Sequence, residues 1–250
     1  MRKILTVVIF GIPIAAVSLD QISLIIISLI KSRKKSDFFY VNAHCLNIAN
    51  KDKEYKRILQ KATLVYSGGF GPVLASRILG RPLYERTPTP DFIENIFLIA
   101  QKKNWSIYLL GGEHGIAGKA AANLKKRFPY LVIAGYHHGF FRKNSKIIEK
   151  INRAKPDIVL VGMGTPRQER WIADNMDTVK SRVFWAVGAL FDILSDKRKR
   201  APKWMQELGL EWAFRLLQEP RRLWRRYVFG NIRFVINVLG QSTFFRKTSR

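Results

Sequence analysis

One stretch of the chain, residues 156–170 with the sequence PDIVLVGMGTPRQER, constrains the fold more than any other. Residues 158–161 form a short, wholly apolar run rich in β-branched side chains, which is typical of a strand covered on both faces in a parallel sheet. Gly162 and Gly164 follow at once, and a polar segment comes next. The stretch therefore predicts a buried strand, a tight glycine turn and then a helix.

The start of that helix has a clear local signature. Thr165 suits the N-cap, Pro166 suits the first helical position, and Gln168 stands where a capping box favours glutamine. Ligands of open α/β sheets gather outside the carboxyl ends of the strands, and free N–H groups at a helix start attract anions. We expect Gly164, Thr165 and Gln168 at an anion site, with a well-capped turn and no ligand as the alternative.

The same order of apolar run and polar or glycine turn recurs along the chain. It occurs at residues 38–44, 62–69, 106–112 and 182–188. This alternation predicts an α/β fold, a Rossmann-like and mostly parallel sheet with helices on both faces. Gly111 and Gly112 lack the spacing of a dinucleotide fingerprint, and no acidic residue closes a neighbouring strand. We therefore expect no nicotinamide and no other cofactor.

The N-terminus resembles a secretory signal because basic residues precede the apolar residues 4–17. However, Gly11 and Pro13 break that run, and Ser18 with Gln21 makes a capping box for a new helix. No stretch reaches the length of an uninterrupted membrane-spanning segment. A folded strand, turn and helix is the favoured interpretation, and a signal or anchor segment is the alternative.

The charge calls for an anionic partner. The chain has 44 Lys and Arg against 18 Asp and Glu, a formal net charge of +26, which suits nucleic acid, an anionic membrane or phosphorylated substrates. No nucleic-acid-binding motif is recognisable, so nucleic acid is the least favoured of the three. The single cysteine, Cys45, excludes an internal disulfide and a multi-cysteine zinc site.

The composition changes at residue 197. Residues 1–196 form the predicted α/β core, and residues 197–250 a basic, aromatic-rich helical appendage. Arg222, Arg225 and Arg226 should share one helical face, flanked by aromatic and aliphatic residues, which suits anionic lipid headgroups. An ordinary basic helix packed by its aromatic residues is the alternative.

Polar residues with possible chemistry follow the predicted strands. Asn42 and His44 come at one strand end, although such a histidine is more often structural. Two prolines stiffen the loop 85–91, so Arg86 could hold a phosphate or carboxylate there. Asp91 follows, and its simplest role is to cap the next helix.

Four segments, GGEHG, KPDIVLVGMGTPRQERWI, VGALFD and KRAPKWMQELGLEWAFRLLQEPRRLWRRY, together resemble the WecG/TagA/CpsF glycosyltransferase family. The resemblance runs from about residue 9 to about residue 234. It implies an inverting, metal-independent enzyme at the cytoplasmic face of the bacterial membrane. Such an enzyme moves an N-acetylhexosamine, its uronate or glucose from a UDP-sugar to a polyprenyl-diphosphate-linked saccharide. The absence of an Asp-x-Asp motif agrees with metal independence.

The resemblance also implies roles for single residues. Asn42, Arg86 and Gln168 match polar residues of the family's motifs, and the turns with Gly68, Gly69, Gly111, Gly112, Gly164 and Thr165 would bind the donor. Arg215, Arg222 and Arg225 match arginines thought to engage the acceptor diphosphate at the membrane. A homo-oligomer is possible.

Two positions depart from the family pattern. Gly68 stands where most members have the aspartate proposed as general base, and Tyr40 replaces a threonine. Glycine cannot accept the proton of the acceptor hydroxyl. We name Asp91 first and His44 second as replacement bases, with Asp192 and Glu113 as further options. Catalysis by leaving-group stabilisation alone, or an inactive homologue that binds lipid-linked saccharide as a partner of another transferase, are the alternatives.

Overall fold

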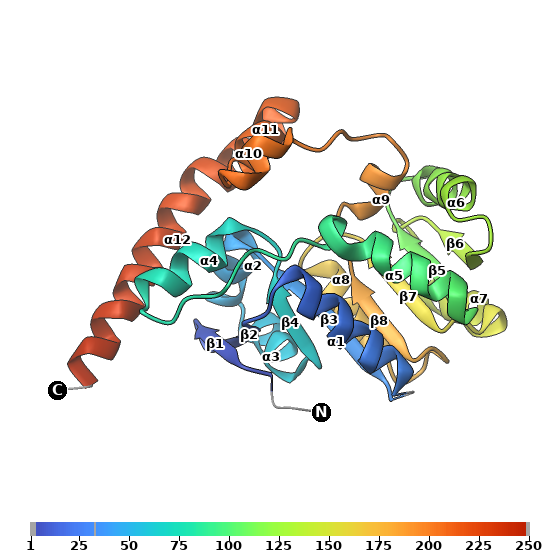
Figure 1. Ribbon diagram of the computed structural model, residues 1–250, viewed down its shortest axis with the longest axis horizontal. Coiled ribbons are helices and arrows are strands. Elements are labelled where there is room, and N and C mark those ends of the chain that lie inside the picture. Colours follow the sequence, from blue (N-terminus) through green and yellow to red (C-terminus); the bar gives the residue numbers. More distant parts are fainter. Residues whose placement is uncertain (1–3, 33, 249–250) are drawn as a thin grey trace.

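The computed structural model describes residues 4–32 and 34–248, and its centre is a six-stranded parallel sheet in the order β4-β3-β8-β7-β5-β6 (Figure 1). The strands are β3 (Ser36–Val41), β4 (Leu64–Ser67), β5 (Ser106–Gly111), β6 (Val132–His137), β7 (Ile158–Gly162) and β8 (Val183–Ala186). Successive side chains of β3 and β7 alternate between two hydrophobic clusters, one on each face of the sheet. Phe38, for example, belongs to one cluster and Phe39 to the other. This alternation places helices on both faces and confirms the predicted Rossmann-like α/β fold.

The helices divide between the two faces. One face is covered by α1 (Leu19–Lys31), α5 (Thr89–Lys103), α6 (Ile116–Arg127) and α9 (Leu190–Leu194). The other is covered by α2 (Ala43–Ala49), α3 (Lys53–Lys61), α4 (Phe70–Ile78), α7 (Asn144–Ala154) and α8 (Arg167–Asn175). Because all six strands run in the same direction, their carboxyl ends lie along one edge of the sheet.

The N-terminal segment folds as predicted, with one difference. β1 (Thr6–Ile9) and β2 (Ile12–Ala15) form a separate antiparallel hairpin that turns at Gly11, instead of adding a strand to the parallel sheet. The Ser18 hydroxyl accepts from the Gln21 N–H at 3.2 Å, and the Gln21 side chain accepts from the Ser18 N–H at 3.0 Å. The predicted capping box of α1 is therefore confirmed.

Two other predicted caps are wrong. α8 begins at Arg167 after Pro166 at the N-cap position, and no side chain caps it. Thr165 instead donates its hydroxyl to Glu169, one turn into the helix. Similarly, α5 starts after Pro88, and Asp91 lies within its first turn as an ion-pair partner of arginines. Side-chain partners, one within the same helix and one more than a hundred residues away, have taken the two side chains away from the local backbone donors.

The C-terminal tail contains α10 (Lys203–Glu207), α11 (Glu211–Gln218) and α12 (Pro220–Thr248), and α12 runs along α2 and α4 (Figure 1). Phe234 and Val238 are buried in the same cluster as the hairpin and α2. Asn47 of α2 donates to the Gly230 carbonyl at 2.7 Å. The tail thus shares a hydrophobic core with the sheet, and the proposed division at residues 196 and 197 stays a prediction.

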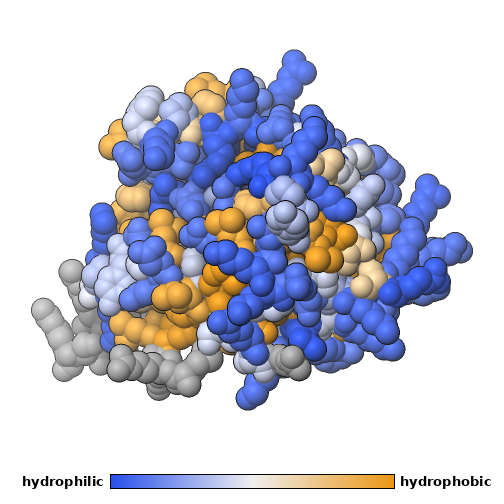
Figure 2. Space-filling model, turned by 45° about the vertical axis from the view of Figure 1, so that its right-hand side comes forward, coloured by the Kyte–Doolittle hydropathy of each residue, from blue (hydrophilic) through white to orange (hydrophobic). Residues whose placement is uncertain are grey.

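None of the helices in the described parts of the chain is long and apolar enough to cross a membrane. Hydrophilic residues cover much of the face seen in Figure 2, with apolar residues exposed between them.

Candidate active site

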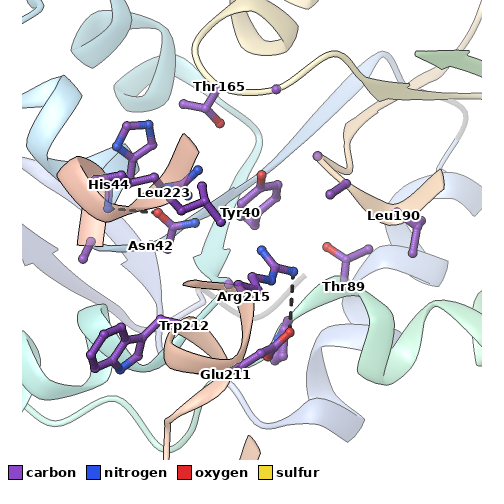
Figure 3. A pocket seen from close by; sticks show the side chains of 18 of the residues that line it. Tyr40, Asn42, His44, Thr89, Thr165, Leu190, Glu211, Trp212, Arg215 and Leu223 are labelled. Atoms are coloured by element: carbon purple, nitrogen blue, oxygen red, sulfur yellow. Dashed lines mark hydrogen bonds and ion pairs between the residues drawn. The ribbon is translucent and has the colours of Figure 1, made fainter. Parts of the chain in front are cut away.

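A cavity of about 460 Å³ lies between the carboxyl edge of the sheet and the tail. The core supplies strand-end turns, among them Asn42 after β3, Gly68 and Gly69 after β4, and Gly188 after β8. The tail supplies side chains of α11 and α12: Arg215 lies beside Tyr40 (Figure 3), and Trp212 belongs to the same lining. Its size and its position outside the strand ends are those of a small-molecule site.

The lining of the cavity is strongly basic. Its arginines are Arg86, Arg167, Arg198, Arg215, Arg222 and Arg226, and its carboxylates are Glu113, Asp192 and Glu211. Six guanidinium groups against three carboxylates leave a formal excess of three positive charges. Guanidinium groups match phosphate oxygens in bidentate geometry, so the cavity suits a ligand with more than one phosphate.

Two helix starts open into the cavity without a side-chain cap. The N-cap of α4 is Gly69 and that of α8 is Pro166, and neither helix has a side-chain cap. Gly69, Gly164 and Thr165 line the cavity. Uncapped N–H groups beside arginines make a further place for phosphate oxygens.

Close packing and backbone conformation explain why glycines occupy the turn after β5. A Cβ at Gly111 would lie 2.2 Å from the Gly162 carbonyl oxygen, and Gly112 has a left-handed φ of +69°. Gly112 lines the cavity, whereas Gly111 packs behind it. These glycines keep two turns close together, and their contact with a donor stays a prediction.

Asn42 and His44 reach the cavity from the start of α2. The Asn42 Oδ1 atom accepts from the N–H groups of His44 and Cys45 at 3.0 and 3.1 Å and so caps this helix. Burial, helped by the positive charge of Arg226, lowers the pKa of His44 to about 4. His44 is therefore neutral near pH 7 but is a weak proton acceptor.

The two departures from the family pattern pack against each other. A Cβ built on Gly68 would lie 2.6 Å from Cδ2 of the Tyr40 ring, well inside van der Waals contact. The ring thus occupies the space that an aspartate side chain at position 68 would need. Burial raises the pKa of Tyr40 strongly, so its hydroxyl stays protonated and acts as a donor. Tyr40 replaces the missing side chain in space without replacing a base.

Asp91, the first predicted base, lies behind the wall of the cavity and is not one of its lining residues. Its two oxygens pair with different arginines, Oδ2 with Arg86 at 3.2 Å and Oδ1 with Arg200 at 2.6 Å. Glu211 of α11 lies 3.9 Å from both guanidinium groups. With both oxygens engaged, Asp91 is placed to orient Arg86 toward the cavity rather than to receive a proton.

Asp192 and Glu113 are also ion-paired. Asp192 lies 3.4 Å from Arg198, and Glu113 lies 2.8 Å from Lys197. The hydrogen bond and the charge of Lys197 lower the pKa of the exposed Glu113. Both carboxylates line the cavity, yet each already has a cationic partner.

Gln168 is fully buried below the cavity floor and is not among its lining residues. Its side-chain oxygen accepts from the Gly188 N–H at 3.1 Å, which joins the turn after β7 to the turn after β8. Its nitrogen donates to Glu169 Oε1 at 2.9 Å. The structure therefore places Gln168 as a brace of two ligand-facing turns, and direct contact with a donor stays a prediction.

The tail arginines divide into two groups. Arg215 and Arg222 line the cavity as expected, but Arg225 lies over the Trp224 ring, with 5.3 Å between the guanidinium carbon and the ring centroid. Arg226 takes a place in the lining instead. Its position one helical turn after Arg222 is the sequence signal that could have indicated this.

No group of three or more His, Cys, Asp or Glu in residues 4–32 and 34–248 is arranged to hold a metal ion. Metal independence nevertheless stays a prediction.

The fold and the site together define an α/β protein whose basic cavity, closed by tail helices, suits a phosphorylated ligand. A model of the glycosyl transferase WecG/TagA/CpsF family matches residues 7–248. The chain therefore belongs to the WecG/TagA/CpsF glycosyltransferase family, as its motifs predict.

Two curated relatives carry the name N-acetylglucosaminyldiphosphoundecaprenol N-acetyl-beta-D-mannosaminyltransferase. The protein of Bacillus subtilis (strain 168) is 30% identical over 214 residues, which cover 84% of this chain and 83% of the relative. The protein of Staphylococcus aureus (strain MRSA252) is 30% identical over 185 residues, which cover 74% of this chain and 72% of the relative.

Proposed function

We propose that this chain is an inverting, metal-independent glycosyltransferase that moves a sugar from a UDP-sugar to a polyprenyl-diphosphate-linked saccharide. One observation carries the proposal: strand-end turns of the core and arginines of the tail face the same cavity. A UDP-sugar and a lipid diphosphate each bring a diphosphate, and a shared basic cavity is what a transfer between them needs.

In this proposal, the donor diphosphate lies at the uncapped starts of α4 and α8, and Arg86 neutralises the charge that develops on UDP. Asp91, which also pairs with Arg200, holds Arg86 in place. Arg215 and Arg222 bind the acceptor diphosphate from the tail side. The names of the relatives make N-acetylmannosamine the first donor sugar and an N-acetylglucosaminyl lipid the first acceptor to examine.

The outward face of α12 supports docking at the cytoplasmic surface of the membrane. Its exposed large hydrophobic residues are Trp224, Val228, Phe229, Ile232, Ile236 and Leu239. At about 100° per residue they fall within about 140° of one another, on the side away from the buried Phe234 and Val238. Aromatic and aliphatic side chains beside arginines suit an anionic lipid interface, and a lipid-linked acceptor is found there.

The test is a set of UDP-sugars incubated with a short-chain polyprenyl-diphosphate N-acetylglucosamine, with products read by mass spectrometry. Transfer of one sugar with an inverted anomeric linkage is expected. Arg222→Ala should weaken use of the acceptor about tenfold or more, whereas Arg233→Ala, on an exposed part of the same helix, serves as the matched control. Binding of acceptor without turnover for any donor would instead support the inactive lipid-saccharide binder.

A further inference from the structure

The proposed transfer requires a proton acceptor, and the carboxylates that line the described cavity are all engaged by cations. Glu113 pairs with Lys197, Asp192 with Arg198, and Glu211 with Arg215. A base must be free to take up a proton near the working pH, and a carboxylate already held by a cation suits that role poorly. The missing group must therefore come from another part of the site.

Glu169 is a carboxylate of a different kind. Its side chain is fully buried, it takes part in no ion pair of the described residues, and its Oε2 atom has no hydrogen-bond partner. Its other oxygen accepts from the Thr165 hydroxyl and from the Gln168 amide, each at 2.9 Å. A buried carboxyl group with one unpartnered oxygen is costly to the fold, which calls for an explanation beyond packing.

Thr165 connects Glu169 with the cavity. The Thr165 side chain lies among the residues that line the cavity (Figure 3). Its hydroxyl hydrogen points to Glu169, while the Gln168 amide at 3.5 Å and the Cys45 sulfur at 3.8 Å make long contacts with its oxygen. A hydroxyl in the cavity that donates to this oxygen would replace one of these long contacts. The two side chains stand one helical turn apart and form a short path for a proton.

We propose that Thr165 and Glu169 relay the acceptor proton and replace the aspartate that is missing at Gly68. The inference rests on the proposed function. As the acceptor oxygen bonds to the anomeric carbon, the bond from that carbon to the donor phosphate oxygen breaks, and UDP leaves with its electron pair. The acceptor proton moves to the Thr165 oxygen while the Thr165 proton moves to Glu169 Oε1. Glu169 ends as a neutral carboxylic acid and later returns its proton to solvent.

The surroundings of Glu169 favour this role. Burial raises the pKa of Glu169 to about 7, and the hydrogen bonds from Gln168 and Thr165 only partly oppose it. The titratable groups that face it are Tyr40 of β3, Cys45 of α2 and Tyr55 of α3. Burial raises the pKa of each of these three as well, so they are neutral while Glu169 titrates. The positive charge of Arg226 of α12 partly opposes the effect of burial on the pKa of Tyr40 and of Cys45.

Four variants of the full-length protein test the relay: Glu169→Gln, Glu169→Asp, Thr165→Val and Thr165→Ser. The kcat of wild type should rise with pH through an apparent pKa near 7. Glu169→Gln and Thr165→Val should lose about 100-fold or more in kcat, with little change in donor KM, and should lose that ionisation. Thr165→Ser keeps the hydroxyl and should keep most of the rate. Glu169→Asp keeps a carboxyl but withdraws it from Thr165, so it should be slow.

Glu149→Gln, the same substitution at an exposed side chain of α7, should match wild type in rate and pH profile. Melting curves establish that each variant is folded. If Glu169→Gln or Thr165→Val is folded and keeps the wild-type rate and pH profile, the relay is overturned while the proposed function stands. If wild type itself transfers no sugar from any donor, the proposed function fails and the relay fails with it.

Discussion

The buried carboxyl group of Glu169 should make the stability of this protein depend on pH. Glu169 has a pKa of about 7 in the folded chain and an ordinary value of 4.5. The folded state therefore holds a proton that the unfolded state has already released between these two values. Stability is highest below the unfolded pKa, falls as pH rises toward the folded pKa, and is constant above it.

The size of the effect follows from the shift. Each pKa unit is worth about 1.4 kcal/mol, so the full shift corresponds to about 3.5 kcal/mol, and about 2.5 kcal/mol of it falls between about pH 5 and about pH 8. Glu169→Gln keeps the shape and the Oε1 acceptor but cannot ionise. Between about pH 5 and about pH 8, the free energy of unfolding of the variant should rise by about 2.5 kcal/mol relative to that of wild type. It should be the more stable protein at the alkaline end.

Urea unfolding of wild type and Glu169→Gln at several pH values in the same salt measures this difference directly, because other titrating groups contribute equally to both proteins. Glu149→Gln, at an exposed side chain of α7, is the matched control, and its curve should run parallel to wild type. Parallel curves for wild type and Glu169→Gln as well would mean that Glu169 ionises at its ordinary pH when folded. Both the reasoning about its burial and the proton relay would then fail.

Three further perturbations test other parts of the site. Gly68→Asp should cost about 1 to 3 kcal/mol because its Cβ meets the Tyr40 ring; adding Tyr40→Thr should recover that stability in urea unfolding, and an equal cost in both backgrounds would exclude the clash. Asp91→Asn should lower the free energy of unfolding by about 2 kcal/mol and reduce kcat more than it raises donor KM, because Arg86 loses its ion-pair partner. Unchanged kinetics would mean that Asp91 does not contribute to catalysis. Phe229→Ser should weaken binding to anionic vesicles about tenfold with little effect on melting, because the side chain is exposed; vesicle binding equal to wild type would mean that this face of α12 does not enter the membrane.

Local features of the fold could be predicted because they depend on neighbours in the sequence. The apolar runs and their glycine turns gave the parallel strands, and Ser18 with Gln21 gave the capping box of α1. The motifs gave the family, and the periodic arginines gave a basic tail whose Arg215 and Arg222 reach the cavity. The interactions behind these features act over one or two turns of chain.

The chemistry of the site was decided by contacts that no short segment encodes. Thr165 looked like a helix cap, yet it donates to a carboxyl group that burial holds near neutrality. Asp91 also looked like a cap, yet Arg200 reaches it from more than a hundred residues away. Gly68 looked like a lost base, yet the ring of Tyr40 fills its space from the neighbouring strand. Burial and long-range pairing set the protonation and orientation of these groups, and both exist only after the sheet, its helices and the tail have come together.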